Sequence, residues 1–464
     1  MISKSCTSFL TFFTILLMLL VYGCAPETRQ VTVPAETPEE FSKPGAVGQA
    51  VPQEWWRSFD NDRLNALVDT ALQQNFTLKT AWERLQASEA VIRRESASFF
   101  PTLDGTGSAN VNRSSDAADS ESFSLGLSST YELDLWGRIR SSVEAESFRA
   151  EASKADYQTA ALTISAEITR TWFRLVEEQQ QRQLLNEQLE TNQTVLSLLE
   201  ARFGSGQIRS VDILRQRQLV EATREQLTNV DSRIAVLEHQ MAVLLGRSPQ
   251  NFMSQSDFEL PDLPPLPQTG VPADLVQRRP DVQIAFNELK AADRDLAAAI
   301  SNRYPRITLS ASLNTAADNA ANLFQEWALS FGGNMIAPIL RGRELSAEAD
   351  RVEAVKKQRL YEYGQTVLIA FQEVENALIQ EQKQKQNIAS IRKQLKLARQ
   401  SYEQLRLEYF NGISNYLDVL TALDEVQRLQ RDLLSARLTL VEYRIALYRA
   451  LAGPFETPRG NSEV

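Results

Sequence analysis

Few side chains of this sequence could perform chemistry. His239 is the only histidine, and it lies between an acid and an amide in a long helical segment, which favours a packed or solvent-facing role. Gly105-Thr106-Gly107 does not fit a phosphate-binding loop, because no Lys follows at the required spacing. The sequence has no set of Cys and His residues with metal-site spacing. We therefore expect no catalytic residues, no metal ligands and no enzyme activity.

Cys24 is the one residue for which the sequence predicts a covalent modification. It follows an apolar run, Phe9 to Val21, that is typical of a signal peptide and too short for a membrane-spanning helix. The segment that ends at Cys24 resembles a bacterial lipobox. This resemblance implies removal of residues 1–23 and attachment of diacylglycerol and fatty acyl groups, typically palmitate, to Cys24. The alternative is an ordinary secretory signal with an incidental cysteine.

The residues after Cys24 indicate a tether and a location. Ala25 stands where the signal for retention in the inner membrane typically has Asp, so the lipobox resemblance favours the outer membrane. Residues 24–53 are rich in Pro, Glu and Thr, which predicts an extended tether without a core of its own. The formal net charge is -10, and an acidic chain is a poor partner for nucleic acid.

The folded part repeats itself at a spacing of about 205 residues, far longer than the period of solenoid repeats. Three pairs of segments carry the repeat: Phe100-Pro101-Thr102-Leu103 and Tyr304-Pro305-Arg306-Ile307, Leu135-Trp136-Gly137-Arg138 and Leu340-Arg341-Gly342-Arg343, and Gly206 and Gly412. We expect two similar halves, 54–248 and 272–455, joined by a proline-rich connector, 249–271, and followed by a tail, 456–464.

Each half contains sequence typical of very long helices, because Gly and Pro are nearly absent over 138–203, 213–245 and 343–411. A run of about 65 residues extends roughly 95 to 100 Å as a helix. Apolar residues recur in steps of three and four, which indicates coiled-coil packing. Glycine ends helices, so we expect the tips of two antiparallel hairpins at Gly204 and Gly206, and at Asn411 and Gly412.

Between the helices the apolar period changes to two, which predicts strands at about 102–112, 122–135, 305–314 and 327–339. One face is apolar and the other polar, as in a transmembrane barrel; a half-buried soluble sheet is the alternative. Four strands cannot close a barrel, because an open edge in lipid leaves backbone groups without partners. We therefore expect a cyclic homo-oligomer, in which three copies would give about twelve strands.

The sequence resembles the TolC-like outer-membrane efflux proteins, and most closely their NodT-type lipoprotein branch. Four segments carry the resemblance: Trp55-Trp56 with Phe59 and Leu64, Tyr131 to Gly137, Arg278-Arg279-Pro280-Asp281-Val282, and Tyr416-Leu417-Asp418-Val419-Leu420. It implies a mainly α-helical homotrimer, with a 12-stranded barrel in the outer membrane continuous with a helical periplasmic barrel. It also implies a periplasmic adaptor (a membrane fusion protein), an inner-membrane pump of the RND type, and export of small molecules.

The same resemblance places a periplasmic gate at Leu417, Asp418 and Thr421 in the second hairpin. Many relatives have an acid at the position of Thr421, so this chain would keep one of two charged rings. The alternative role for Asp418 is a carboxylate at a helix N-terminus, favoured by the helix dipole.

A different class of function remains open from the sequence alone, namely a coiled-coil scaffold lipoprotein without a pore. It would explain the heptads and the tether. It would not explain four amphipathic strands of membrane-spanning length.

Overall fold

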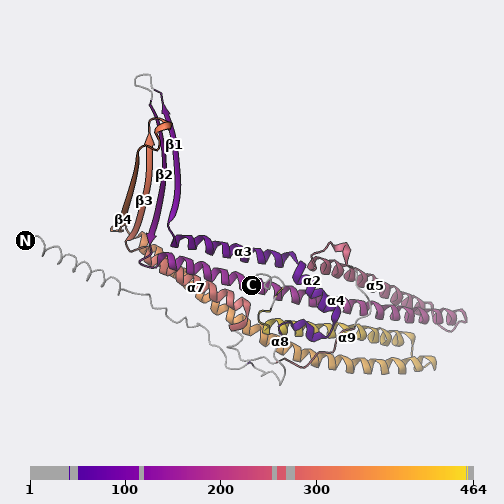
Figure 1. Cartoon of the computed structure of the whole chain (residues 1–464). Helices are drawn as coiled ribbons and strands as arrows, with labels where there is room; N and C mark the ends of the chain where they lie inside the picture. Colours follow the sequence, from indigo (N-terminus) through magenta and orange to yellow (C-terminus); the bar gives the residue numbers. More distant parts are fainter. Residues whose placement is uncertain are drawn as a thin grey trace, which may run out of the picture. The chain divides into compact units, whose positions relative to one another are not determined.

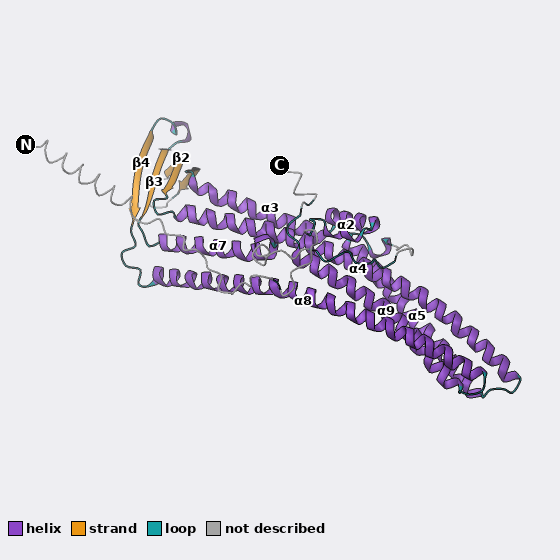
Figure 2. Ribbon diagram, turned by 90° about the horizontal axis from the view of Figure 1, so that it is seen from below, coloured by secondary structure: helices purple, strands orange, loops and turns teal. Residues whose placement is uncertain are grey.

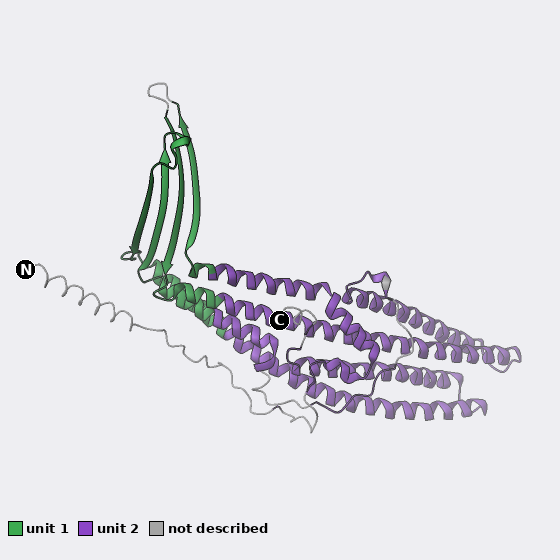
Figure 3. Ribbon diagram, viewed as in Figure 1, with its two compact units in different colours: residues 1–34, 97–145, 292–360 green, residues 35–96, 146–291, 361–464 purple. Residues whose placement is uncertain are grey.

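The computed structural model describes residues 41, 51–113, 120–252, 259–267, 277–455 and 457. Cys24, most of the tether, much of the connector and nearly all of the tail lie outside the described residues. The chain divides into two compact units (Figure 3), whose described parts fall within Ala97–Ala145 and Ala292–Leu360 for unit 1, and within Ala35–Ser96, Glu146–Ala291 and Tyr361–Val464 for unit 2.

Unit 1 contains one antiparallel sheet in the order β1-β2-β3-β4 (Figure 1). The repeats meet at its centre, where β2 of the first half pairs with β3 of the second. The strands lie close to the segments of alternating polarity, and β4 ends three residues before the expected 339. Their bounds are β1 Thr102–Asn112, β2 Ser120–Leu133, β3 Arg306–Ala317 and β4 Trp327–Ile336.

The register joins the apolar residues of all four strands into one face. Directly paired residues lie on the same side of a sheet, and the apolar residues of each strand pair mostly with apolar or small residues of the next. One such row contains Leu127, Leu313 and Leu329, which are 48%, 40% and 52% exposed. This face leaves large side chains uncovered in a single chain. Within the described part of the chain, no helix has the length and apolar character needed to cross a membrane.

Four long helices form two antiparallel hairpins, as the scarcity of Gly and Pro predicts (Figure 2). The first hairpin is α4 (Arg138–Gly204) with α5 (Ser210–Leu244), and the second is α8 (Glu344–Phe410) with α9 (Tyr416–Leu451). The shorter helices are η1 (Trp55–Phe59), α2 (Asp62–Gln74), α3 (Phe76–Ser96) and α7 (Pro280–Ser301). In the second hairpin the predicted apolar seam is confirmed, since Leu395 of α8 packs with Val426 and Leu429 of α9.

Both hairpin tips end their first helix with the same glycine motif. Gly206 and Gly412 have φ angles of 76° and 74°, a region that costs other residues strain. The amides one residue later donate back across the last turn, from Gln207 to the Arg202 carbonyl at 3.0 Å and from Ile413 to the Glu408 carbonyl at 2.8 Å. This is the Schellman pattern. Gly204 is instead the last residue of α4, and Asn411 lies in the turn.

The segment Trp55-Trp56 builds the largest apolar core of unit 2. Both indoles are fully buried, and the Trp55 ring lies 5.8 Å from the ring of Tyr448 on α9. Phe59 packs against Phe173 of α4, with ring centroids 5.0 Å apart. The first residues of the folded part therefore pack onto helices from both repeats. Burial of each aromatic ring stabilises this packing by an energy on the order of a few kcal/mol.

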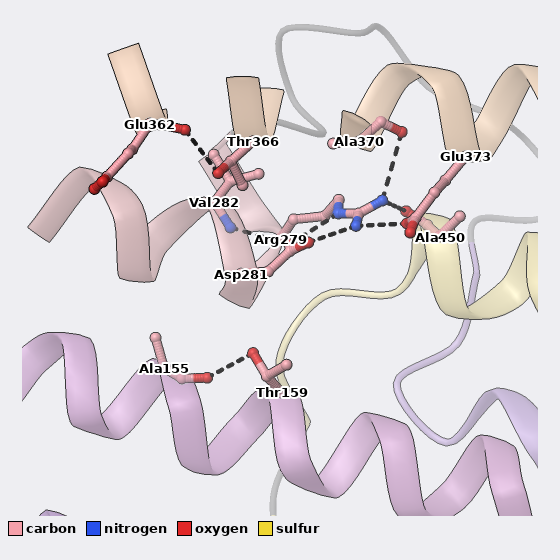
Figure 4. Close-up of polar contacts among 10 residues, drawn as sticks. All are labelled: Ala155, Thr159, Arg279, Asp281, Val282, Glu362, Thr366, Ala370, Glu373 and Ala450. Atoms are coloured by element: carbon pink, nitrogen blue, oxygen red, sulfur yellow. Dashed lines mark hydrogen bonds and ion pairs between the residues drawn. The ribbon is translucent and has the colours of Figure 1, made fainter. Parts of the chain in front are cut away.

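The segment Arg278 to Val282 positions a buried guanidinium (Figure 4). Arg279 is 6% exposed and donates to Asp281 at 2.6 and 2.9 Å and to Glu373 of α8 at 2.7 Å. It also donates to the carbonyl of Ala450 on α9 at 3.3 Å. A single arginine thus ties the start of α7 to both helices of the second hairpin, which gives this sequence motif a structural reason.

A second buried arginine, Arg444 of α9, fastens the connector. It forms a bidentate pair with Glu381 of α8 at 2.7 and 2.8 Å, and both side chains are at most 1% exposed. It also donates to the carbonyls of Pro264 at 2.7 Å and Pro265 at 3.2 Å. Burial alone would raise the pKa of Glu381, but the hydrogen bonds and charge of Arg444, with help from Lys385, hold that pKa below its usual value.

We predict that Arg444→Leu lowers the free energy of unfolding by about 3 kcal/mol, because it strips Glu381 of its main buried partner. Urea unfolding of detergent-solubilised protein, followed by tryptophan fluorescence, measures the loss. Arg437→Leu is the matched control, because Arg437 makes one hydrogen bond to the Leu260 carbonyl at 3.0 Å, worth about 1 kcal/mol. Equal effects of the two substitutions would contradict this assignment.

The same pair makes stability depend on pH. Because folding lowers the pKa of Glu381, the stability that this carboxylate contributes is fully present above its pKa in the unfolded chain. It is lost as pH falls through its pKa in the folded protein.

We predict that Gly412→Ala loosens the second tip, because alanine at a positive φ costs about 1 to 2 kcal/mol. Amide hydrogen exchange around Ile413 should become roughly 5 to 30 times faster. Gly204→Ala is the control, because that glycine has helical geometry and an added Cβ meets nothing within 4 Å. Unchanged exchange in Gly412→Ala, or faster exchange in both variants, would count against the motif.

Candidate functional site

The two hairpin tips place equivalent aspartates in opposite environments. Asp212, in the first turn of α5, is 5% exposed and lies near Arg209 at 3.4 Å and Arg215 at 3.9 Å. Asp418, in the first turn of α9, is exposed and has no ion-pair partner within the described residues. The repeat therefore supplies one buried, neutralised carboxylate and one free carboxylate.

The predicted gate residues share the exposed side at the start of α9. Leu417 is 41% exposed, and Asp418 and Thr421 are also exposed. The Thr421 hydroxyl donates to the Leu417 carbonyl at 2.8 Å, so it is satisfied within the helix. Asn415 caps the helix by accepting from the Asp418 amide at 3.2 Å. The cap is thus supplied by Asn415, which leaves the Asp418 carboxylate available.

Tyr416 anchors this exposed turn to the first hairpin. Its ring is 3% exposed in a cluster with Leu199 and Ile213, and its hydroxyl donates to the Gln216 side-chain oxygen at 2.5 Å. Gln216 in turn donates to the Asn192 carbonyl at 2.7 Å. Burial raises the pKa of Tyr416 well above its ordinary value, and its neighbours add to the shift, so the phenol stays a neutral donor.

An amide clasp, which we define as Asn192 of α4 and Gln427 of α9, joins the hairpins deeper along their length. The two side chains bond reciprocally: Gln427 donates to Asn192 at 2.9 Å, and Asn192 donates to Gln427 at 3.2 Å. Asn192 is 0% exposed and Gln427 is 3% exposed. Gln188 adds a bond to the Gln427 carbonyl at 3.1 Å. Neither glutamine was expected to be buried, because glutamine on a helix rich in charged residues is normally solvent-exposed.

A cation–π contact also joins the two hairpin tips. The Arg202 guanidinium of α4 lies 5.1 Å from the ring of Tyr409 and 5.6 Å from that of Phe410, the last residues of α8. The two tips therefore meet through polar, cation–π and apolar side-chain contacts, the last in the cluster of Leu199, Ile213, Tyr416 and Val419.

Other chemistry is sparse within the described ranges. They contain no group of three or more His, Cys, Asp and Glu residues that could hold a metal ion. His239 lies exposed on α5.

The arrangement matches known outer-membrane channels in sequence. The profile of the family described as outer membrane efflux protein matches residues 67–247 and 271–453, once in each repeat. The chain is 27% identical to the pyoverdine export outer membrane protein OpmQ of Pseudomonas aeruginosa, over 97% of this chain and 98% of that protein. It is also 27% identical to nodulation protein T of Rhizobium leguminosarum bv. viciae, over 92% of this chain and 90% of that protein.

The fold agrees as well. The solved outer-membrane channel OprN is 27% identical, with a TM-score of 0.85 over 93% of this chain and 99% of that one. The solved structure of CusC is 26% identical, with a TM-score of 0.81 over 92% and 99%. These likenesses confirm the family resemblance, the fold class and the outer-membrane location. With both repeats matched, the chain belongs to the outer membrane efflux protein family and is the outer-membrane component of a tripartite efflux system.

Proposed function

We propose that three copies of this chain form one conduit, a barrel of about twelve strands continuous with a helical barrel. The observation that carries this proposal is the sheet of unit 1. Its outer strands β1 and β4 each pair on one side only within the described residues, and its apolar face is exposed. In lipid, unpaired backbone groups cost several kcal/mol each, so the edges require partners. Copies of the same chain supply them.

The polar face then lines the passage and the apolar face contacts lipid. Phe331 and Trp327, 78% and 68% exposed, lie on the face that would meet lipid. A periplasmic scaffold without a pore would expose these rings to water. The sheet therefore favours the channel over the scaffold.

The partners follow from the family. We infer that the helical hairpins meet a periplasmic adaptor, a membrane fusion protein, which connects them to an inner-membrane pump of the RND type. The names of relatives cover pyoverdine export, a toluene efflux pump and cation efflux. Such varied cargo supports a conduit whose specificity lies in the pump, with small molecules as its cargo.

The gate is proposed to be the exposed turn of α9 that carries Leu417, Asp418 and Thr421. Around a threefold axis this turn would give a ring of three carboxylates and three leucines. Opening would move the second hairpin and exchange the Tyr416 and Arg202 contacts, while the buried Asp212 stays with the first hairpin. The tips at Gly204, Gly206, Asn411 and Gly412 would be the ends that face the adaptor.

The N-terminus is proposed to be anchored through Cys24, with diacylglycerol and fatty acyl groups in the outer-membrane lipid. The support is the lipobox-like segment and the similarity to nodulation protein T, a relative at 27% identity.

We predict that Asp418→Ala raises single-channel conductance in planar bilayers, because alanine is smaller and cannot hold a cation or a hydrogen bond at the entrance. The control is Asp231→Ala on α5, which also removes one exposed carboxylate per chain but lies away from the tip. Equal conductance of wild type and Asp418→Ala would rule out a gate at this turn.

We predict that Cys24→Ser abolishes the acyl mass on the N-terminal peptide while the protein still needs detergent and still migrates differently on gels after heating. Mass spectrometry measures the acyl mass on the N-terminal peptide, and gel electrophoresis measures the change in migration after heating. A variant that becomes fully soluble would support the scaffold and overturn the channel. An unmodified Cys24 in the wild type would overturn lipidation alone.

A further inference from the structure

The polar face of the sheet is arranged in rows of short neutral side chains. One row contains Thr102, Thr130, Ser310 and Gly332, and another contains Thr106, Gly126, Asn314 and Ala328. Within the face, the Ser108 and Ser124 hydroxyls lie 2.8 Å apart. Hydroxyls and amides can donate or accept, so these rows have no preference for one sign of charge.

Three ionisable residues interrupt this face over the described strands: Asp104, Glu132 and Arg306. Glu132 is neutralised by Arg138, whose guanidinium nitrogens lie 2.9 and 3.0 Å from its carboxylate. Asp104 and Arg306 are exposed, and neither has an ion-pair partner among the described residues. The face therefore presents one free carboxylate and one free guanidinium per chain.

The register keeps these two charges apart. Asp104 shares a row with Ser128 and Ser312, and Ser312 lies six residues beyond Arg306 on β3. Six residues of strand span about 20 Å. The Debye length is about 10 Å at 0.1 M salt, so each charge is screened from the other and acts on its own stretch of the face.

We propose that Asp104 and Arg306 set the charge preference of the strand-built part of the conduit. This inference rests on the proposed function, in which the polar face lines the passage. Three copies then present two rings of opposite sign, one of guanidinium and one of carboxylate groups, in a lining that is otherwise hydroxyl and amide. Because the two rings carry equal and opposite charge, neither cations nor anions are preferred over the strand-built stretch as a whole, and loss of one ring makes the conduit selective.

The test is the reversal potential of the full-length protein in planar bilayers under a KCl gradient near 0.1 M. All variants are made in the Asp418→Ala background, so that the gate carboxylate does not dominate the measurement. Asp104→Asn should lower the potassium-to-chloride permeability ratio and Arg306→Gln should raise it. Each shift should be roughly twofold, the effect of a unit charge about 8 Å away in water.

Two control variants and one control condition test the charge effect. Ser312→Ala removes a hydroxyl from the row of Asp104 without changing charge and should leave the ratio unchanged. The double variant should return the ratio close to that of the background. At 1 M salt, where the Debye length is about 3 Å, the single-variant shifts should largely disappear.

The outcomes separate this inference from the proposed function. If variants assemble as heat-modifiable oligomers and conduct, but the ratio does not move with either charge, Asp104 and Arg306 do not determine selectivity. Shifts in the same direction for both variants would overturn the opposed rings. If the wild type forms no conducting channels, the proposed function fails and this inference fails with it.

Discussion

The constraint on which the whole structure depends is the backbone hydrogen bonding of a sheet placed in lipid. Water satisfies the edge of a soluble sheet at little cost, whereas hydrocarbon satisfies nothing. The edges of β1 and β4 therefore fix what the rest of the chain must do. The strands must carry apolar side chains outward, and the helices that continue from them must be long enough to associate beyond the membrane. An open sheet of this kind is a part of a larger wall.

Much of this architecture follows from sequence periodicity. The apolar period of two over residues 123–135 locates β2, since nothing but a strand alternates in that way over membrane length. Long segments in which Gly and Pro are nearly absent locate the helices. Gly206 and Gly412 mark where the first helix of each hairpin ends, because both adopt a positive φ. These patterns are local, so they predict a strand or a helix end without knowledge of which segments pack against it.

Local patterns do not predict the contacts between the hairpins. Gln188 and Gln427 are buried, although glutamine on a long charged helix is normally solvated. Arg444 donates to carbonyls of the connector that lie 180 and 179 residues before it, and no pattern along the chain predicts that pairing. Asp212 and Asp418 occupy equivalent positions in the repeat, yet the first is covered by arginines that the second lacks. Tertiary contacts determine the burial of the glutamines, the pairing of Arg444 and the environments of the two aspartates. The Asp418 carboxylate is exposed because no arginine in the described part of the chain covers it as Arg209 and Arg215 cover Asp212.

The amide clasp has a consequence for how the two repeats can be combined. Ala398 is the equivalent of Asn192 in the second repeat, and Glu221 is the equivalent of Gln427 in the first. Asn192 with Glu221, or Ala398 with Gln427, could not form the reciprocal bonds. A ring of six identical half-length chains would therefore lack this contact everywhere. The clasp therefore requires one copy of each repeat, so neither half can take the place of the other at this contact.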